Sequence, residues 1–175
     1  LLTVSDRDIF VTTQKALLVG IILKNETRAD KEESLKELVN LVKTAGSSPT
    51  IIQMKRVEKV DPKTFIGKGS ITELVDISKA NDIDVVLFDC ELTPNQQKEL
   101  RTLFQCDVVD RTGLILDIFA LHAQSKEATL QVELALTTYL KPRLAGLGKT
   151  LNQQGGGIGT RGPGEAKLAN DISLI

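Results

Sequence analysis

Short apolar runs alternate with amphipathic stretches between residues 16 and 110 of this 175-residue chain. The runs 16–23 and 84–89 are almost continuously apolar, which is typical of strands buried on both faces of a sheet, and 49–57 and 106–110 are further strand candidates. Between these runs, apolar residues recur at helical spacing. Strict alternation of strand and helix indicates βαβ units, so this part is predicted to be α/β, a small parallel sheet with flanking helices.

Local signals predict where the helices begin and end. For the first helix, 30–45, Asp30 and Glu33 provide a cap and Gly46 a stop. The segment 70–73 has the form of a capping box, Ser-Ile-Thr-Glu, so the second helix is predicted to begin at Ser70. In 93–96, Thr-Pro-Asn-Gln, a capping threonine precedes a proline at the first helical position, which predicts the start of the third helix.

The pattern changes after residue 110. Residues 112–140 contain no proline and keep apolar residues at helical spacing, which predicts either one continuous helix or two helices with Ser125 as a new cap. Pro142 is expected to end this helix. A returning helix over 163–175 would pack antiparallel on it, so we predict an α/β subdomain over 1–110 and a long antiparallel helical hairpin over 111–175, with a glycine-rich loop at 146–164.

Composition narrows the functional classes. With 41% hydrophobic and 26% charged residues the chain is typical of a soluble globular protein, and its few aromatic residues argue against base-stacking platforms. Cys90 and Cys106 flank predicted strands, so we expect reduced, structural thiols in a cytoplasmic protein. The single histidine, His122, and the lack of metal-ligand spacing argue against a zinc site.

Glycine dominates the segment 155–165, where it occupies six of eleven positions. The stretch 141–167 around it carries five lysines and arginines against one glutamate, whereas the chain as a whole has a net charge of −1. A flexible connector is one interpretation. The other is that a loop with few side chains, bracketed by cations at the tip of a helical hairpin, enters a narrow polyanionic cavity.

Three segments resemble nucleotide-binding motifs, although none is complete. Residues 148–150, Gly-Lys-Thr, lack the glycine that a P-loop needs earlier, since Arg143 stands there. Residues 67–70, Gly-Lys-Gly-Ser, open a helix and are a candidate phosphate contact, with a capped turn as the alternative. Residues 110–113, Asp-Arg-Thr-Gly, match a GTPase pattern too short to be specific. The residues alone therefore reveal no catalytic site.

Four longer motifs together resemble the HflX family of ribosome-associated GTPases. They are Asp-Arg-Thr-x-Leu-Ile-Leu-Asp-Ile-Phe-Ala (110–120), Glu-x-x-Leu-Gln-Val-Glu-Leu-Ala (127–135), Tyr-Leu-x-Pro-Arg-Leu (139–144) and Gly-Gly-Gly-Ile-Gly-Thr-Arg-Gly-Pro-Gly-Glu (155–165). The segments 65–69 and 73–74 also fit the family, and the resemblance covers roughly residues 14–168.

This resemblance implies a domain that binds the large ribosomal subunit and places its loop near the peptidyl-transferase centre, in ribosome splitting and rescue under stress. GTP and Mg²⁺ would belong to a following G domain, because neither a P-loop nor Asn-Lys-x-Asp occurs in these residues. The partners implied are ribosomal RNA and the protein's own G domain. The resemblance assigns RNA contact to these residues: Arg143, Lys149, Gly155, Gly156, Gly157, Gly159, Arg161, Gly162 and Gly164.

Two other hypotheses use the same loop differently. In one, a small α/β enzyme closes the loop as a lid over a nucleotide or a phosphorylated metabolite, with Gly67, Lys68, Gly69 and Ser70 as the phosphate contact. In the other, the hairpin is a dimerisation arm. The first predicts saturable nucleotide binding that depends on Lys68 or Arg161, and the second predicts a concentration-dependent dimer.

Overall fold

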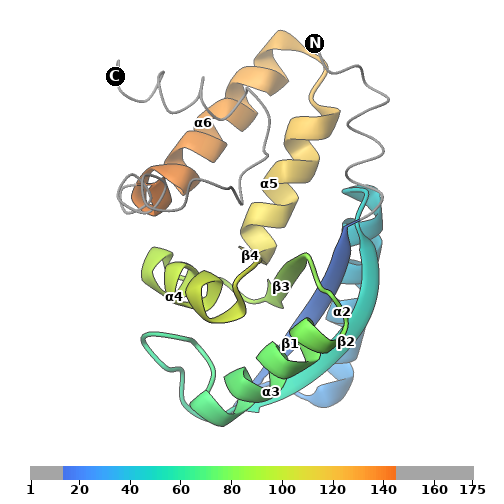
Figure 1. Cartoon of the computed structure of the whole chain (residues 1–175). Coiled ribbons are helices and arrows are strands. Elements are labelled where there is room, and N and C mark those ends of the chain that lie inside the picture. The colour runs from blue at the N-terminus through green and yellow to red at the C-terminus, as the bar shows by residue number, and fades with distance from the viewer. Residues whose placement is uncertain (1–13, 145–175) are drawn as a thin grey trace. The chain divides into compact units, whose positions relative to one another are not determined.

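A single four-stranded parallel sheet organises the chain in a computed structural model that describes residues 14–144 (Figure 1). The strands lie in the order β2-β1-β3-β4, and their bounds are β1 (Lys15–Leu23), β2 (Ser48–Val57), β3 (Val85–Asp89) and β4 (Asp107–Asp110). Strand β1 lies centrally, with Leu18 in register with Ile52 of β2 and Leu87 of β3. The predicted parallel α/β sheet is therefore confirmed.

Within residues 14–144 five helices accompany the sheet: α2 (Arg28–Thr44), α3 (Lys68–Ala80), α4 (Pro94–Phe104), α5 (Arg111–His122) and α6 (Lys126–Leu144). Inter-residue contacts divide the chain into two compact units, one ending at Leu121 and the other beginning at His122. Helix α5 therefore groups with the sheet, whereas α6 belongs to the second unit. The reason is that α5 continues directly from β4 and buries Gly113 and Leu114 in its first turn.

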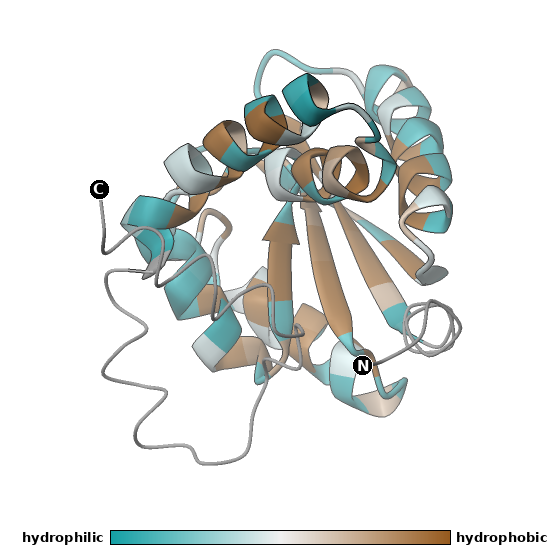
Figure 2. Cartoon of the chain, turned by 90° about the horizontal axis from the view of Figure 1, so that it is seen from above, coloured by the Kyte–Doolittle hydropathy of each residue, from teal (hydrophilic) through white to brown (hydrophobic). Residues whose placement is uncertain are grey.

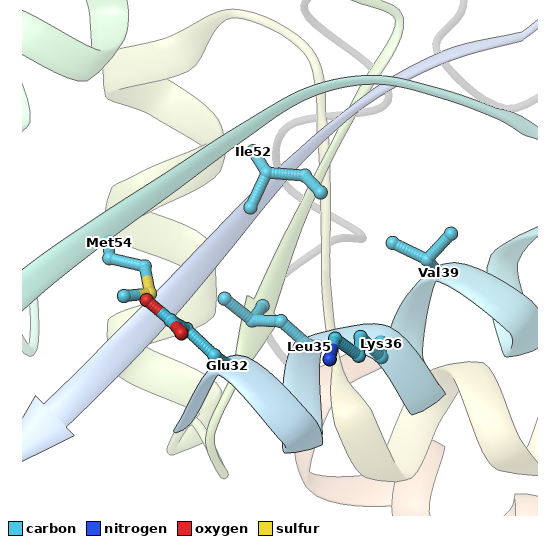
Figure 3. A pocket seen from close by; sticks show the side chains of 6 residues that line it. All are labelled: Glu32, Leu35, Lys36, Val39, Ile52 and Met54. Carbon is cyan, nitrogen blue, oxygen red and sulfur yellow. The ribbon is translucent and has the colours of Figure 1, made fainter. Parts of the chain in front are cut away.

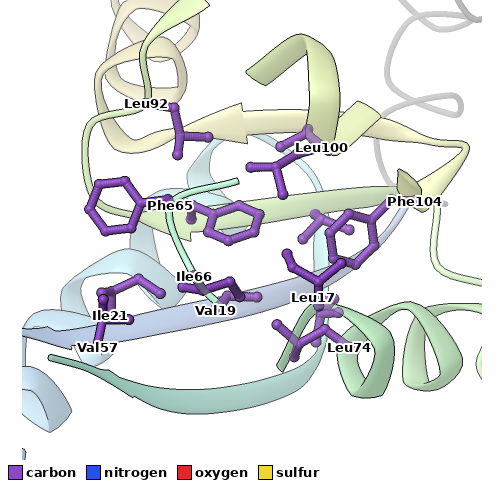
Figure 4. Packing of buried hydrophobic residues seen from close by; sticks show 14 of the residues in the cluster. Leu17, Val19, Ile21, Val57, Phe65, Ile66, Leu74, Leu92, Leu100 and Phe104 are labelled. Carbon is purple, nitrogen blue, oxygen red and sulfur yellow. The ribbon is translucent and has the colours of Figure 1, made fainter. Parts of the chain in front are cut away.

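One face of the sheet carries the larger apolar cluster, which also receives side chains from α3 and α4 (Figure 4). Leu17 and Val19 of β1 contribute from the sheet, Leu74 from α3 and Leu100 from α4. The Phe88 and Phe104 rings meet edge to face, with centroids 6.3 Å apart. The central strands β1 and β3 are coloured hydrophobic over most of their length in Figure 2, as strands covered on both faces require.

The other face packs against α2 and the start of α5. Leu35, Leu38 and Val42 recur along α2 at helical spacing and are buried with strand residues such as Leu18, while Leu114 of α5 joins the same cluster. Gly20 of β1 lies directly under α2. A Cβ atom there would stand 2.7 Å from Leu35 Cδ1, so glycine permits the close approach of helix and strand.

The cap predictions have different outcomes. The capping box of Thr93 and Gln96 is confirmed at the start of α4, and Gly46 adopts the positive φ of 88° expected after α2. The box predicted at Ser70 is wrong, because α3 begins at Lys68 with Gly67 as its cap. Helix α2 begins at Arg28, two residues before the predicted start, and its cap is Thr27, whose side-chain oxygen accepts the Asp30 backbone N–H.

Between β4 and Leu144 the chain forms two helices, so the continuous-helix prediction is wrong and the alternative break at Ser125 is confirmed. The Ser125 hydroxyl accepts the Ala128 backbone N–H at 3.1 Å, which is an N-cap for α6. The prediction that Pro142 ends the helix is wrong, because α6 continues to Leu144 with Pro142 inside its last turn. The returning segment 163–175 and most of the glycine-rich loop lie outside the described residues, so the antiparallel hairpin stays a prediction.

Candidate functional site

The carboxyl ends of β1 and β3 form the topological switch point of this sheet. The chain leaves β1 toward β2 on one side, whereas β3 lies on the other side of β1. In open parallel sheets, ligands bind outside the carboxyl ends of the strands at such a point. The residues that follow these strands are therefore the first place to look for chemistry.

A buried carboxylate ends β3 at this position. Asp89 is in register with Gly20, and its side chain is 1% exposed. One carboxylate oxygen accepts a hydrogen bond from the Ser34 hydroxyl of α2 at 2.8 Å, while the other accepts one from Arg111 Nη1 at 2.7 Å. Two charge-assisted or polar partners therefore stabilise a carboxylate that would be costly to bury alone.

Arg111, the first residue of α5, joins three elements. Its Nη1 also donates to the Ser34 hydroxyl at 2.6 Å, and its Nη2 donates to Glu37 Oε2 at 2.9 Å. The guanidinium thus ties the start of α5 to α2 and to the end of β3. We call Asp89, Arg111, Ser34 and Glu37 the Arg111 anchor.

Lys31 extends this anchor along α2. Its Nζ lies 3.6 Å from Asp89 Oδ2 and 3.5 Å from Glu26 Oε2, and the lysine is buried. Among these groups, two cations face three carboxylates, those of Asp89, Glu26 and Glu37. This charge balance favours a self-satisfied ion-pair network over a site for an anionic ligand.

The short GTPase-like motif at 110–113 has a structural role in this fold. Asp110 is fully buried, and its carboxylate accepts the Gly113 backbone N–H at 2.9 Å, as an N-cap of α5 does. Its second oxygen accepts the Leu92 backbone N–H at 3.1 Å, which ties the β3–α4 loop to the end of β4. The motif therefore caps the first turn of α5, and its aspartate is used for that cap instead of for a nucleotide.

The loop between β2 and α3 is held in one strained conformation. Phe65 has a φ of 67°, unusual for an aromatic residue, and it is buried. Its backbone exchanges two hydrogen bonds with Asp61, at 2.9 and 3.0 Å, and Gln96 Nε2 donates to the Asp61 carbonyl at 2.9 Å. The backbone N–H groups of Lys63 and Thr64 lower the pKa of the Asp61 carboxyl.

This loop presents the candidate phosphate contact, Gly67 to Ser70. Gly67, Lys68 and Gly69 are exposed, and a Cβ atom added at either glycine would meet nothing within 4 Å. Packing therefore does not require glycine at these two positions. The first two residues of the motif Phe65-Ile-Gly-Lys-Gly are thus buried in the core, whereas its last three are exposed at the start of α3.

Of the candidate RNA contacts, Arg143 is the one that lies among the described residues. Arg143 is in the last turn of α6, where its Nη1 donates to the Tyr139 carbonyl at 2.9 Å and its guanidinium carbon lies 3.8 Å from the centre of the Tyr139 ring. Lys149, Arg161 and the six glycines stay predictions. The structure therefore does not bring the Gly67 segment and the glycine-rich loop together as one described site.

A shallow groove opens elsewhere, between α2 and the edge strand β2 (Figure 3). Its volume is about 240 Å³ and its lining is mostly apolar, from Leu35, Val39, Ile52 and Met54, with Glu32 and Lys36 at the rim. None of the predicted site residues lines it. The groove holds no pair of groups suited to acid–base or nucleophilic chemistry.

Both cysteines are free thiols, as predicted, and neither is poised to react. Burial raises the pKa of Cys90 to about 12 and that of Cys106 to about 11, so both are protonated at neutral pH. Within residues 14–144 no group of three or more His, Cys, Asp or Glu side chains is arranged to hold a metal ion. In the same part of the chain, no helix is both long and apolar enough to cross a bilayer.

Sequence reasoning missed the Arg111 anchor, although one signal was present. Asp89 ends a strand that is otherwise wholly apolar and buried, and a carboxylate in that position needs a partner. The partners, Ser34 and Arg111, stand 55 positions before and 22 positions after it in the chain. Only the sheet order brings them together.

The fold defines a class of protein, an open parallel α/β domain followed by a helix of a second unit. Among the described residues, no complete nucleotide-binding site is present. Two family models match the chain: "GTP-binding GTPase N-terminal" over residues 32–120 and "GTP-binding GTPase Middle Region" over 122–175. Together with relatives named GTPase HflX, these matches show that the chain belongs to the HflX family of GTPases and corresponds to its N-terminal and middle regions.

These relatives extend well beyond the chain. GTPase HflX of Flavobacterium psychrophilum is 42% identical over 94% of the chain and 40% of its own length. The protein of the same name from Alkalihalophilus pseudofirmus is 46% identical over 96% and 38%, respectively, and that of Escherichia coli is 42% identical over 93% and 37%. The chain therefore spans about two-fifths of the length of these relatives.

A solved structure supports the same fold. The GTP-binding protein of the hyperthermophilic archaeon Sulfolobus solfataricus, determined in complex with GDP, matches with a TM-score of 0.57 and 27% sequence identity. The match covers 78% of this chain and 40% of that protein. Over the matched part, the backbone of this chain is thus similar to that of a GTP-binding protein.

Proposed function

We propose that this chain is the ribosome-binding part of an HflX GTPase and that its glycine-rich loop contacts ribosomal RNA of the large subunit. The observation that carries this proposal is the distribution of charge. Arg143 stands at the end of α6, and Lys149 and Arg161 follow in a segment where glycine is the commonest residue. Cations can neutralise RNA phosphates, while a backbone with few side chains can approach the nucleic acid closely.

GTP binding and hydrolysis belong, in this proposal, to a following G domain that would also hold Mg²⁺. The 175 residues contain no P-loop, and the Asp110–Gly113 motif caps a helix. Family membership supports the division, because relatives named as GTPases are more than twice as long as this chain. Ribosome splitting and rescue under stress, in the cytoplasm, is the cellular role that we assign to the whole protein.

Co-sedimentation with purified large ribosomal subunits across a salt series tests the proposal. The parent chain is compared with a Lys149→Ala/Arg161→Ala variant, and Lys79→Ala/Lys98→Ala serves as the control with the same loss of charge from exposed positions on α3 and α4. Binding should weaken steeply between about 50 and 200 mM salt, and the loop variant should lower the slope of log K against log salt by about one for each lost phosphate contact.

The control makes the result specific to the loop. If Lys79→Ala/Lys98→Ala reduces the slope as much as the loop variant, the attraction is a general effect of charge and the loop assignment is wrong. Absence of binding even at low salt would reject ribosome binding by this chain. A deletion of the glycine-rich loop that leaves the affinity unchanged would reject the loop as the RNA contact.

A further inference from the structure

We propose that the loop between β2 and α3 presents a second RNA-binding surface, which contacts phosphates of a double-helical RNA segment in the large subunit (Figure 1). Four cations form this surface, and we call them the β2–α3 surface: Arg56, Lys59, Lys63 and Lys68. All four lie in the described part of the unit that ends at Leu121. The choice of the large subunit as partner rests on the proposed function, whereas the surface itself is a property of the sheet unit.

The four side chains of this surface are exposed and unpaired. Among residues 14–144, none of them forms an ion pair with another residue. Neighbouring cations differ, because Lys55 of β2 pairs with Glu73 of α3. Lys31 and Arg111 both pair with the buried carboxylate of Asp89. The β2–α3 surface therefore holds positive charge that the fold itself does not use.

The acidic residues of the same segment do not cancel this charge. Residues 56–70 contain four cations against two acidic residues, Glu58 and Asp61, although the whole chain has a net charge of −1. The Asp61 carboxylate is engaged by the loop, since Oδ1 accepts the backbone N–H groups of Lys63 and Thr64 at 2.7 and 3.1 Å. A local excess of unpaired positive charge attracts a polyanion even to a protein that is negative overall.

The loop holds these cations on an ordered backbone. Phe65 and Ile66 are buried in the apolar cluster (Figure 4). Two backbone hydrogen bonds between Asp61 and Phe65 close the turn that carries Lys63. Gln96 of α4 also donates to the Asp61 carbonyl at 2.9 Å. Because the backbone is already ordered, binding costs less conformational entropy than binding by a free loop.

Glycine leaves the surroundings of Lys68 open. Gly67 and Gly69 flank this lysine, and a Cβ atom added at either glycine would meet nothing within 4 Å. Gly69 lies within α3, where glycine is less favourable than alanine. Packing inside this chain therefore does not explain either glycine. A partner that approaches the backbone closely does explain them, because it needs small side chains beside the cation.

The side chains of the surface suit the phosphate backbone of an RNA helix. Among residues 56–70 the one aromatic side chain, that of Phe65, is buried, so unpaired bases have no exposed ring on which to stack. Arginine and lysine bind phosphates without reading the sequence. Double-stranded RNA is recognised mostly in this way, through its shape and its phosphate and 2′-hydroxyl groups.

Amide chemical shifts of the isotope-labelled 175-residue chain test the surface residue by residue. The probe is an RNA duplex of about 16 base pairs at about 50 mM salt, where phosphate contacts are strong. The duplex should shift amides within residues 56–70. Absence of shifts in this segment would overturn the inference. Shifts confined to 155–165 would also overturn it and would leave the glycine-rich loop as the RNA contact.

Charge-neutral variants test whether the cations supply the affinity. Lys59→Gln/Lys63→Gln changes two exposed loop positions outside the strands and helices, and it should lower the slope of log K against log salt for the duplex by about two. Lys59→Arg/Lys63→Arg should keep the parent slope, because both charges stay. A lowered slope for the arginine variant would make the effect structural and would overturn the proposed contact.

A matched control removes the same charge elsewhere. Lys36→Gln/Lys43→Gln neutralises two exposed cations of α2, which covers the face of the sheet opposite to α3. This variant should keep the parent slope. An equal loss of slope in the control would mean that the duplex follows the overall charge of the chain, and the β2–α3 surface would then be wrong.

ATP separates an RNA surface from a site for a single nucleotide. At the same total phosphate concentration as the duplex, ATP should leave residues 56–70 nearly unshifted, because one triphosphate releases few counterions. A saturable response to ATP in this segment, equal to that of the duplex, would assign the segment to a nucleotide and overturn the RNA surface.

Co-sedimentation with large ribosomal subunits tests the partner. Lys59→Gln/Lys63→Gln should lower the salt slope by about two, in addition to the loss caused by Lys149→Ala/Arg161→Ala. If the parent chain binds subunits and this variant keeps the parent slope, the ribosomal contact of the β2–α3 surface is wrong, while the loop assignment stands. If the parent chain does not bind subunits, the proposed function fails, and the duplex titration still decides whether this surface binds RNA.

Discussion

The α/β unit and helix α6 differ in how many of their apolar side chains are buried. Every buried hydrophobic residue in the described part of the chain lies between Ala16 and Leu114. In α6, by contrast, no described side chain is buried, and Leu130 and Leu134 are 55% and 69% exposed. Since most helical stability in proteins comes from tertiary packing of an apolar face, the measurable stability of the molecule should reside in the sheet and its covering helices.

The same comparison separates the roles of the two regions. The sheet unit is closed by buried ion pairs and caps, such as Asp89 with Arg111. Helix α6 contributes Lys141 and Arg143 to its last turn, immediately before the glycine-rich loop. The RNA contact that we propose for the loop would therefore draw on the cations of this second region, while the sheet unit would supply most of the stability.

The largest expected difference comes from truncating one apolar side chain in each region. Phe88→Ala removes a fully buried ring that meets Phe104, and it should lower the free energy of unfolding by about 3–5 kcal/mol. Leu134→Ala removes a mostly exposed side chain and should change it by about 0.5 kcal/mol or less. Urea denaturation followed by circular dichroism measures both. Comparable losses would show that α6 shares the stabilising core.

A smaller effect is expected from adding one methyl group at a glycine. Gly20→Ala places a Cβ 2.7 Å from Leu35 Cδ1, so it should cost about 1–3 kcal/mol through overpacking of α2 on β1. Gly69→Ala is the matched control, since its Cβ meets nothing within 4 Å and alanine favours the helix. Thermal denaturation of the two variants should move in opposite directions. An unfolding temperature of Gly20→Ala equal to that of the parent would contradict this close packing of α2 on β1.

The smallest effect concerns the Cys90 thiol at alkaline pH. Its pKa is raised by burial to about 12, above the 9.0 of an unperturbed thiol, so the folded state holds the proton more tightly than the unfolded state. The resulting stability is present below pH 9 and is lost as the pH rises from 9 toward 12. Near pH 10 the loss is about 1 kcal/mol. Cys90→Ala should remove this part of the pH dependence, and an identical pH profile for parent and variant would contradict it.

Local signals explain why much of the α/β unit was predictable. Apolar runs predicted the strands. The capping box of Thr93 and Gln96 was predicted correctly because both partners lie within four residues. The start of α3 was misread since Gly67, which has no side chain, caps it in place of Ser70. The break at Ser125 was one of two open alternatives, because both helices have the same periodicity.

The residues of the candidate site also differ in whether the sequence alone could predict them. Arg143 and the glycine-rich loop stand out in the linear sequence, because charge and glycine content need no partner to be visible. The Arg111 anchor does not, since its hydrogen bond to Ser34 joins residues 77 positions apart. No periodicity relates such positions, and only the crossing from β2 over β1 to β3 brings them together.

The sequence by itself determined the alternation of strands and helices, the family and the cationic glycine-rich segment, because each depends on neighbours within a few residues or on composition. The tertiary structure alone decided the strand order, the need for glycine at position 20 and the role of Asp110 and Arg111 at the base of α5. These features depend on which distant segments share the sheet, and burial then forces each charged group there to find a partner.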